Sequence, residues 1–185
     1  MKRETASRRN RQTGMTLIEA AVAILVLTIG VTAVAAVFVS GVRFMGHSQD
    51  ALLARVKAQE AIESVYAGRD DQSLQWADIL NVNGATGSDG GKFLDAALPI
   101  NDPGLDGLVN TKDDGGPEYV VEPGPDGVYG TADDVKVPIT KFRRQIVIRD
   151  AGIPNVSLRT LTVIITDAST GAVVYKISTY ISPYS

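Results

Sequence analysis

The sequence predicts an α+β fold in which a long N-terminal helix packs on a C-terminal antiparallel β-sheet of three to four strands. Three observations support this prediction. A run without charged residues, from Ala20 to Val39, leads into a stretch with helical apolar periodicity. A long region rich in Gly, Asp and Pro follows, and it favours turns and loops. From Phe142 onwards, apolar and polar residues alternate as they do in strands.

The first segment, residues 1–14, is a polar and basic leader without apolar periodicity. A single acid, Glu4, stands against Lys2, Arg3, Arg8, Arg9 and Arg11. Positively charged flanks of a membrane helix stay in the cytoplasm. We therefore expect the N-terminus in the cytoplasm and the chain beyond Arg43 in the periplasm.

The second segment is the uncharged run. Its twenty residues would rise about 30 Å as a helix, which matches the hydrocarbon core of a bilayer. The apolar part of a secretory signal is shorter, roughly 7–15 residues. Glu19 lies just inside this apolar segment, where a carboxylate would cost about 3 kcal/mol at mid-bilayer and usually marks a function.

The leader, Gly14 and the following residues MTLIEAAVAILVLTIG together resemble the prepilin signal of type IV pilins and type II secretion pseudopilins. The resemblance is specific over roughly residues 8–40 and extends beyond them only to the general layout. It implies that a prepilin peptidase cleaves between Gly14 and Met15 and methylates the new N-terminus. It also implies that Glu19, the fifth mature residue, guides assembly with other pilins or pseudopilins.

Two departures from the family pattern indicate which kind of pilin or pseudopilin to expect. The first mature residue is Met15, where phenylalanine is commonest, and the apolar run lacks the proline that many major pilins carry. We therefore expect a minor pilin or minor pseudopilin, most like the minor pilins of pilus assembly and modification.

Glu19 also has a purely structural interpretation. Thr16 and Glu19 have the spacing of a capping box, and an acid in the first turn suits the helix dipole. The two roles are compatible. The α-amine of mature Met15 would have a pKa of about 8 and be cationic. The carboxylate of one subunit could pair with the amine of its neighbour, and a wrong register would leave a buried charge unpaired.

The helix is expected to continue beyond the membrane, from Met15 to Ala67, with residues up to about 42 in the membrane or the filament core. Its outer part carries a stripe spaced three or four residues apart, formed by Ala54, Ala58, Ile62 and Val65. Gly68 is a suitable C-cap. This stripe needs an apolar partner, which the C-terminal sheet can supply.

Residues 68–140 form the predicted loop region, and an internal repeat lies within it. DPGLDGLVNTKDD at 102–114 aligns with EPGPDGVYGTADD at 122–134 at an offset of twenty residues. Oxygen-rich loops of this kind can bind Ca²⁺, although Asp-Gly and Pro-Gly are also simple turn formers. Some pseudopilins hold a calcium ion in the loop ahead of the sheet, and this resemblance favours calcium. The candidate calcium ligands are Asp102, Asp106, Asp113, Asp114, Glu122, Asp126, Asp133 and Asp134.

Residues 141–185 are the predicted antiparallel sheet. Its strands lie in FRRQIVIR, VSLRTLTVIITD and VVYKISTYI, and a change of apolar parity between Leu158 and Leu161 predicts a bulge. Residues 119–121 and 135–137 are expected to add short strands on either side of the second repeat. A short helix is expected near the single tryptophan, over 75–80.

Composition argues against catalysis and against DNA binding. The chain has 185 residues, a net charge of −3, no cysteine and one histidine, His47. No nucleotide-binding, serine-hydrolase or zinc-protease motif is present, so we expect a protein that is not an enzyme. The external part is acidic, and its only candidate cations for nucleic acid are Lys141, Arg143, Arg144 and Arg149.

The sequence therefore predicts a structural subunit of a type IV pilus or a type II secretion pseudopilus. Its expected partners are prepilin peptidase, other pilins or pseudopilins, and inner-membrane lipid before assembly. Two alternatives remain at this point. One is a signal-anchored periplasmic calcium-binding or adhesion domain that does not polymerise, and the other is a competence pseudopilin for DNA uptake.

Overall fold

The computed structural model describes residues 16–82, 90–154 and 157–184. Gly14 and Met15, on either side of the expected cleavage, lie outside the described residues. The chain divides into two compact units, Met1–His47 and Ser48–Ser185. We describe each unit by itself.

The longest element is helix α1, Leu17–Asp70, with 54 residues. The most apolar 18-residue window of α1 has a mean hydropathy of 2.8, and none of it is buried. Among the described residues, α1 is the one helix that is long and apolar enough to cross a membrane. An apolar stretch exposed along its whole length is stable only in lipid or against other protein surfaces.

The C-terminal part of α1 belongs to the second unit and carries a buried stripe. Ala54, Ala58, Ala61 and Val65 are all 0% exposed. Three of these side chains are methyl groups, which lets the helix approach the sheet closely. The stripe predicted from the sequence is therefore the face that packs on the core.

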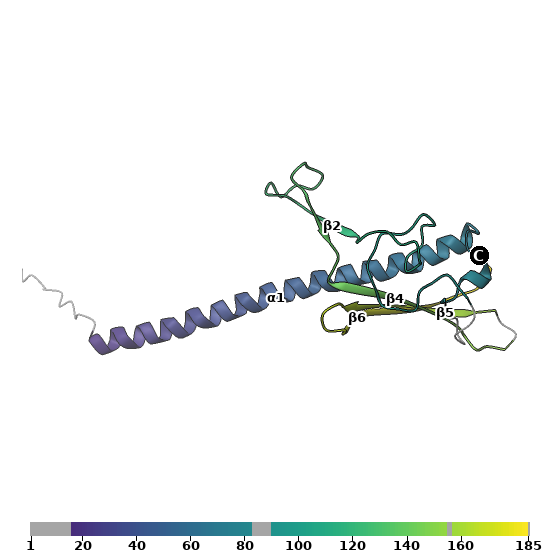
Figure 1. Ribbon diagram of the computed structural model, residues 1–185. Coiled ribbons are helices and arrows are strands. Elements are labelled where there is room, and N and C mark those ends of the chain that lie inside the picture. Colours follow the sequence, from purple (N-terminus) through teal and green to yellow (C-terminus); the bar gives the residue numbers. More distant parts are fainter. Residues whose placement is uncertain (1–15, 83–89, 155–156, 185) are drawn as a thin grey trace, which may run out of the picture. The chain divides into compact units, whose positions relative to one another are not determined.

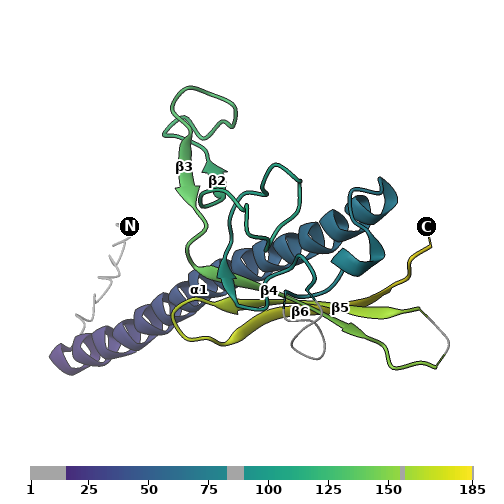
Figure 2. The ribbon, with the colours of Figure 1, turned by 45° about the vertical axis from the view of Figure 1, so that its right-hand side comes forward.

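The helix packs on a four-stranded antiparallel sheet, and the predicted fold class is confirmed. The strand order is β1-β4-β5-β6, and Figures 1 and 2 show the C-terminal part of α1 along one face of this sheet. The strands are β1 (Leu98–Pro99), β4 (Phe142–Asp150), β5 (Arg159–Asp167) and β6 (Val173–Ile181).

Alternation along the two central strands forms the core. In β4 the buried positions include Ile146 and Ile148, and in β5 they include Leu161 and Val163. The predicted bulge between Leu158 and Leu161 is wrong in its position. The pairing of β5 with β6 is regular there, and the register shifts between Ile165 and Thr166. The apolar parity changes because Leu158 precedes the strand.

The region between α1 and β4 contains a one-turn 3₁₀-helix, Trp76–Asp78, and a second, two-stranded sheet. Strands β2 (Tyr119–Glu122) and β3 (Val135–Pro138) pair antiparallel, so both short strands predicted around the second repeat are confirmed. Figures 1 and 2 show this hairpin projecting away from the larger sheet.

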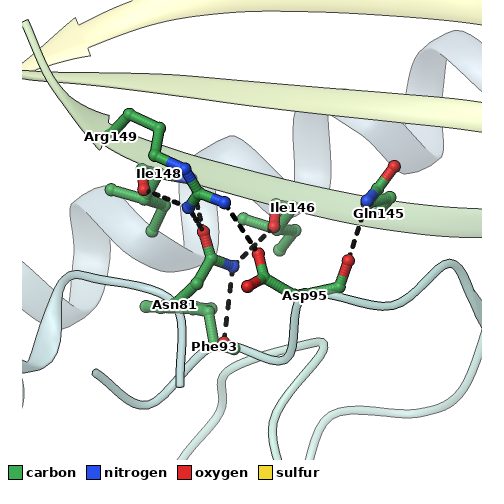
Figure 3. A network of polar contacts seen from close by, with 7 residues as sticks. All are labelled: Asn81, Phe93, Asp95, Gln145, Ile146, Ile148 and Arg149. Atoms are coloured by element: carbon green, nitrogen blue, oxygen red, sulfur yellow. Dashed lines mark hydrogen bonds and ion pairs between the residues drawn. The ribbon is translucent and has the colours of Figure 1, made fainter. Parts of the chain in front are cut away.

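Two buried asparagines complete the edge of β4, because β1 pairs with only two of its residues. The side-chain amide of Asn81 donates to the carbonyl of Ile146 at 2.8 Å, and its Oδ1 accepts from the backbone N–H of Ile148 at 2.7 Å (Figure 3). Asn110 Nδ2 donates to the carbonyl of Arg144 at 2.9 Å. Loop side chains therefore replace a neighbouring strand and hold the irregular region against the sheet.

Candidate functional site

The first candidate site is the start of α1. The backbone N–H of Glu19 donates to Thr16 Oγ1 at 3.4 Å, which is the N-cap half of the expected capping box. The Glu19 side chain is exposed and makes no ion pair within the described part of the chain. Its carboxylate is therefore available to a group from outside these residues.

The apolar span satisfies its own polar groups. The hydroxyl of Thr28 donates to the carbonyl of Ile24 at 2.7 Å, and that of Ser40 donates to the carbonyl of Ala36 at 2.9 Å. The hydroxyl of Thr32 likewise donates to carbonyls one turn earlier. Because lipid offers no hydrogen-bond partners, this internal pairing makes the span compatible with a membrane despite its hydroxyl groups.

Comparison with protein families decides the nature of this segment. Residues 9–35 match the family model described as the prokaryotic N-terminal methylation motif, which is the prepilin-type signal of type IV pilins and pseudopilins. The chain carries a prepilin-type signal. Neither the curated proteins nor the solved structures contain a match to this chain.

The prepilin-type signal has direct consequences. It supports a type IV pilin-like or pseudopilin substrate of prepilin peptidase, and it implies assembly with other pilins. The signal and the apolar helix together fit a membrane-anchored pilin. The interpretation of Gly14, Met15 and Glu19 stays a prediction, because the match is to the motif as a whole.

The second candidate site is the acidic repeat, whose two copies share one backbone conformation. The N–H of Gly107 donates to the carbonyl of Gly104 at 3.1 Å, and the N–H of Gly127 donates to the carbonyl of Gly124 at 2.9 Å. Both Gly107 and Gly127 have positive φ, 72° and 69°. The Asp-Gly turn expected from the sequence is therefore present in each copy.

That turn brings the early glycine of each copy against its late acids. A Cβ added to Gly104 would lie 2.2 Å from Asp113 Oδ2, and one added to Gly124 would lie 2.2 Å from Asp133 Oδ2. Glycine is required at both positions because any side chain would collide with the carboxylate. The two copies are thus structural as well as sequence repeats.

The carboxylates of the repeats accept hydrogen bonds from the chain itself. Thr111 Oγ1 donates to Asp113 Oδ1 at 2.7 Å, and Thr131 Oγ1 donates to Asp133 Oδ1 at 2.6 Å. These hydroxyls hold the pKa of both aspartates below the ordinary value. The threonine shared by the two copies has this role, which sequence reasoning did not assign.

A metal site does not emerge from side-chain grouping alone. Among the described residues, no three acidic, histidine or cysteine side chains gather as metal ligands would. Within the part of the chain that the structure describes, Asp134 Oδ1 is the one buried side-chain oxygen without a hydrogen-bond partner. Its counterpart, Asp114 Oδ1, accepts from the N–H of Thr111 at 2.9 Å. The expected calcium ligands Asp102 and Glu122 begin the two copies, Glu122 being exposed at the end of β2.

The cations considered for nucleic acid do not form a common surface. Arg144 is 1% exposed, and its Nε donates to Asn110 Oδ1 at 2.8 Å. Arg149 pairs with Asp95 at 3.2 Å, and Lys141 pairs with Asp50. The side chain of His47 lies outside the described ones.

Proposed function

We propose that the protein is a structural, non-enzymatic subunit, a minor pilin or minor pseudopilin, assembled into a type IV pilus or a type II secretion pseudopilus. The observation that carries the proposal is the prepilin-type signal at residues 9–35. The exposed apolar helix that follows supports it, since such a helix suits both the bilayer and a bundle of like helices.

Assembly follows from the chemistry at the start of α1. Removal of the leader frees the amine of Met15, which is cationic at neutral pH because its ordinary pKa is about 8. The Glu19 carboxylate of one subunit pairs with this amine on the next subunit in the apolar filament core. A subunit in the wrong axial register leaves both charges unpaired, which costs far more than the correct pairing.

The N-terminal mass of the membrane-extracted protein, made with and without prepilin peptidase, tests the proposal. We expect a mature chain that starts at Met15 and carries one extra methyl group. Gly14→Ala should abolish this processing, because a methyl group next to the scissile bond blocks a site shaped for glycine. Leu17→Ala is the matched control, and its leader should still be removed.

An intact leader in the presence of active peptidase would reject the proposal in favour of a signal-anchored periplasmic domain. Normal processing together with a salt-dependent DNA shift by the protein would instead favour a competence pseudopilin. Lys141 and Arg149 already form ion pairs within the chain, and Arg144 donates to Asn110, which argues against DNA binding by these residues.

We also propose that the second repeat binds Ca²⁺. The buried, unpartnered Oδ1 of Asp134 favours this, because a buried carboxylate oxygen without a donor is costly. Calcium accepts backbone carbonyls as well as carboxylates, so three grouped acids are not required. Two other carboxylates of this copy lie at its Asp-Gly turn. Asp126 Oδ1 accepts from the N–H of Val128 at 2.8 Å, and Asp133 Oδ2 accepts from the N–H of Asp126 at 3.4 Å.

Thermal unfolding, followed by the fluorescence of the single tryptophan, tests calcium binding. Calcium at about one hundred times its Kd adds about 2.7 kcal/mol of stability, a rise in Tm of roughly 5–10 °C that EDTA should reverse. Asp134→Asn should remove this rise in Tm. Asp114→Asn should lower the Tm measured without calcium, but calcium should still raise it. An unchanged Tm of the unaltered protein at millimolar Ca²⁺ would reject the proposal.

A further inference from the structure

A small pocket opens at the C-terminal end of α1. It has a volume of about 250 Å³ and lies between the turn after α1, the 3₁₀-helix and the segment after β6. Its walls include three apolar side chains, two amides and one cation, namely Trp76, Ile79, Pro183, Gln72, Gln75 and Arg69. Pockets for drug-sized ligands are larger, roughly 300–1,000 Å³, so this one suits a ligand of about one ring.

Gln72, on the wall of this pocket, has a strained backbone conformation. Its φ is 62°, in the left-handed region, where any side chain costs free energy relative to glycine. The other described residue with positive φ that is not a glycine is Asn110, whose buried amide binds Arg144. The exposed side chain of Gln72 makes no hydrogen bond within the described ranges of the chain. The fold itself therefore does not require a glutamine at this position.

The turn that carries Gln72 is held by its own hydrogen bonds. The N–H of Leu74 donates to the carbonyl of Gly68 at 2.8 Å, and the N–H of Ser73 donates to Asp71 Oδ1 at 2.9 Å. The backbone of the turn is thus ordered before a ligand arrives, which lowers the entropy cost of binding.

Trp76 gives the pocket a flat apolar surface. The guanidinium of Arg159 lies 4.0 Å from the centre of the indole ring and donates to the carbonyls of Trp76 and Ile79. Arg159 is buried and does not line the pocket, so the pocket meets the part of the ring that Arg159 leaves uncovered. The half-buried ring is therefore fixed by Arg159 and still open to a ligand.

The chemistry of the walls selects the class of ligand. Among the described residues no carboxylate lines the pocket, so a metal ion or an organic cation would lack a partner. Arg69 is paired with Asp70 at 2.6 Å and lies over the ring of Tyr66, so an anion would have to displace Asp70. A purely apolar ligand would remove water from the two amides without replacing its hydrogen bonds. A neutral ligand with an apolar face and several hydroxyl groups meets all of these conditions.

We propose that this pocket binds a single neutral sugar residue. The C–H face of the sugar ring lies against Trp76, and its hydroxyl groups form hydrogen bonds with the amides of Gln72 and Gln75, each of which can donate and accept. The strained glutamine is then retained for its contact with the ligand. This inference goes beyond the proposed function and does not depend on removal of the leader.

The test uses the single tryptophan of the chain, which reports binding directly because it lines the pocket. The full-length protein, in a detergent without a sugar headgroup, is titrated with the methyl glycosides of glucose, galactose, mannose and N-acetylglucosamine. We expect a saturable change of fluorescence with at least one of them. Its Kd should be on the order of 1 mM, because so small a ligand makes few contacts. Inorganic phosphate, an anion without an apolar face, should give no saturable change.

Two substitutions separate binding from folding. Gln72→Gly should raise the Kd about tenfold through the loss of a hydrogen-bonding amide. It should leave Tm unchanged or higher, because glycine relieves the backbone strain. Ser73→Ala is the matched control, since Ser73 is the next residue in the turn and does not line the pocket, and it should leave the Kd unchanged.

Four results would overturn the proposal. The first is no saturable change with any of the four glycosides at about one hundred times the expected Kd. The second is a Kd that Gln72→Gly leaves unchanged, and the third is saturable binding of phosphate in place of the sugars. The fourth is a fall in the Tm of Gln72→Gly, because the glutamine would then be retained for the fold.

Discussion

Replacing Arg144 by leucine is expected to lower the free energy of unfolding by about 3 kcal/mol, because it leaves buried acceptors without donors. Arg144 Nε donates to Asn110 Oδ1 at 2.8 Å, and one terminal nitrogen donates to the carbonyl of Asn101 at 3.5 Å. Burial lowers the pKa of Arg144, and the carboxylates of Asp114, Glu118 and Glu60 oppose this effect. An arginine stays protonated under these conditions, so its loss also removes a cation near Asp114, whereas Glu60 and Glu118 keep their ion pairs with Lys57.

The measurement is thermal unfolding of the purified protein in detergent, followed by tryptophan fluorescence. A loss of about 3 kcal/mol corresponds to a fall in Tm of roughly 6–12 °C for a domain of this size. Arg143→Leu is the matched control, because Arg143 directly precedes Arg144 in β4 and is exposed. Equal effects of the two substitutions would show that the buried contacts of Arg144 do not stabilise the fold.

The regular elements were predictable because each carries a periodic signal. The stripe of Ala54 and Ala58 predicted the buried face of α1, and alternation in β4 and β5 predicted the sheet. Arg144 and Arg159 occupy buried positions in those strands. From alternation alone, an arginine at a buried position cannot be told from a strand whose inward and outward faces have been assigned the wrong way round. The partners that make their burial tolerable, such as Asn110, lie far away in the sequence.

The candidate sites were predictable to different degrees. The prepilin-type signal depends on adjacent residues, so its motif could be recognised without any structure. The acidic repeats were found from sequence identity. That identity could not show that the first copy is buried against its own domain while the second is exposed. That difference depends on Leu108 and Val128, whose similar chemistry hides their opposite exposure. Tertiary packing, which the local sequence does not encode, decides it.

Replacing Asn81 by alanine is expected to be more damaging still, with a loss of about 4 kcal/mol and a fall in Tm of roughly 8–16 °C. The side chain is 0% exposed and uses both ends of its amide (Figure 3). Its Oδ1 accepts from the N–H of Ile148 at 2.7 Å and from Arg149 at 2.6 Å, while Nδ2 donates to Ile146. Alanine leaves a buried backbone N–H and a buried carbonyl unpaired in the middle of β4.

Amide hydrogen exchange gives this prediction a second, local readout. In Asn81→Ala the amide of Ile148 should lose more protection than amides in the ladder between β5 and β6, because it donates to Asn81 Oδ1. Gln145→Ala is the matched control. Gln145 makes a comparable loop contact, donating to the carbonyl of Asp95 at 2.7 Å, but it is partly exposed. Its loss should cost about 1 kcal/mol, because water can replace it. If protection fell uniformly across the sheet in Asn81→Ala, the asparagine would contribute only to global packing and would not act as the missing strand at the edge of β4.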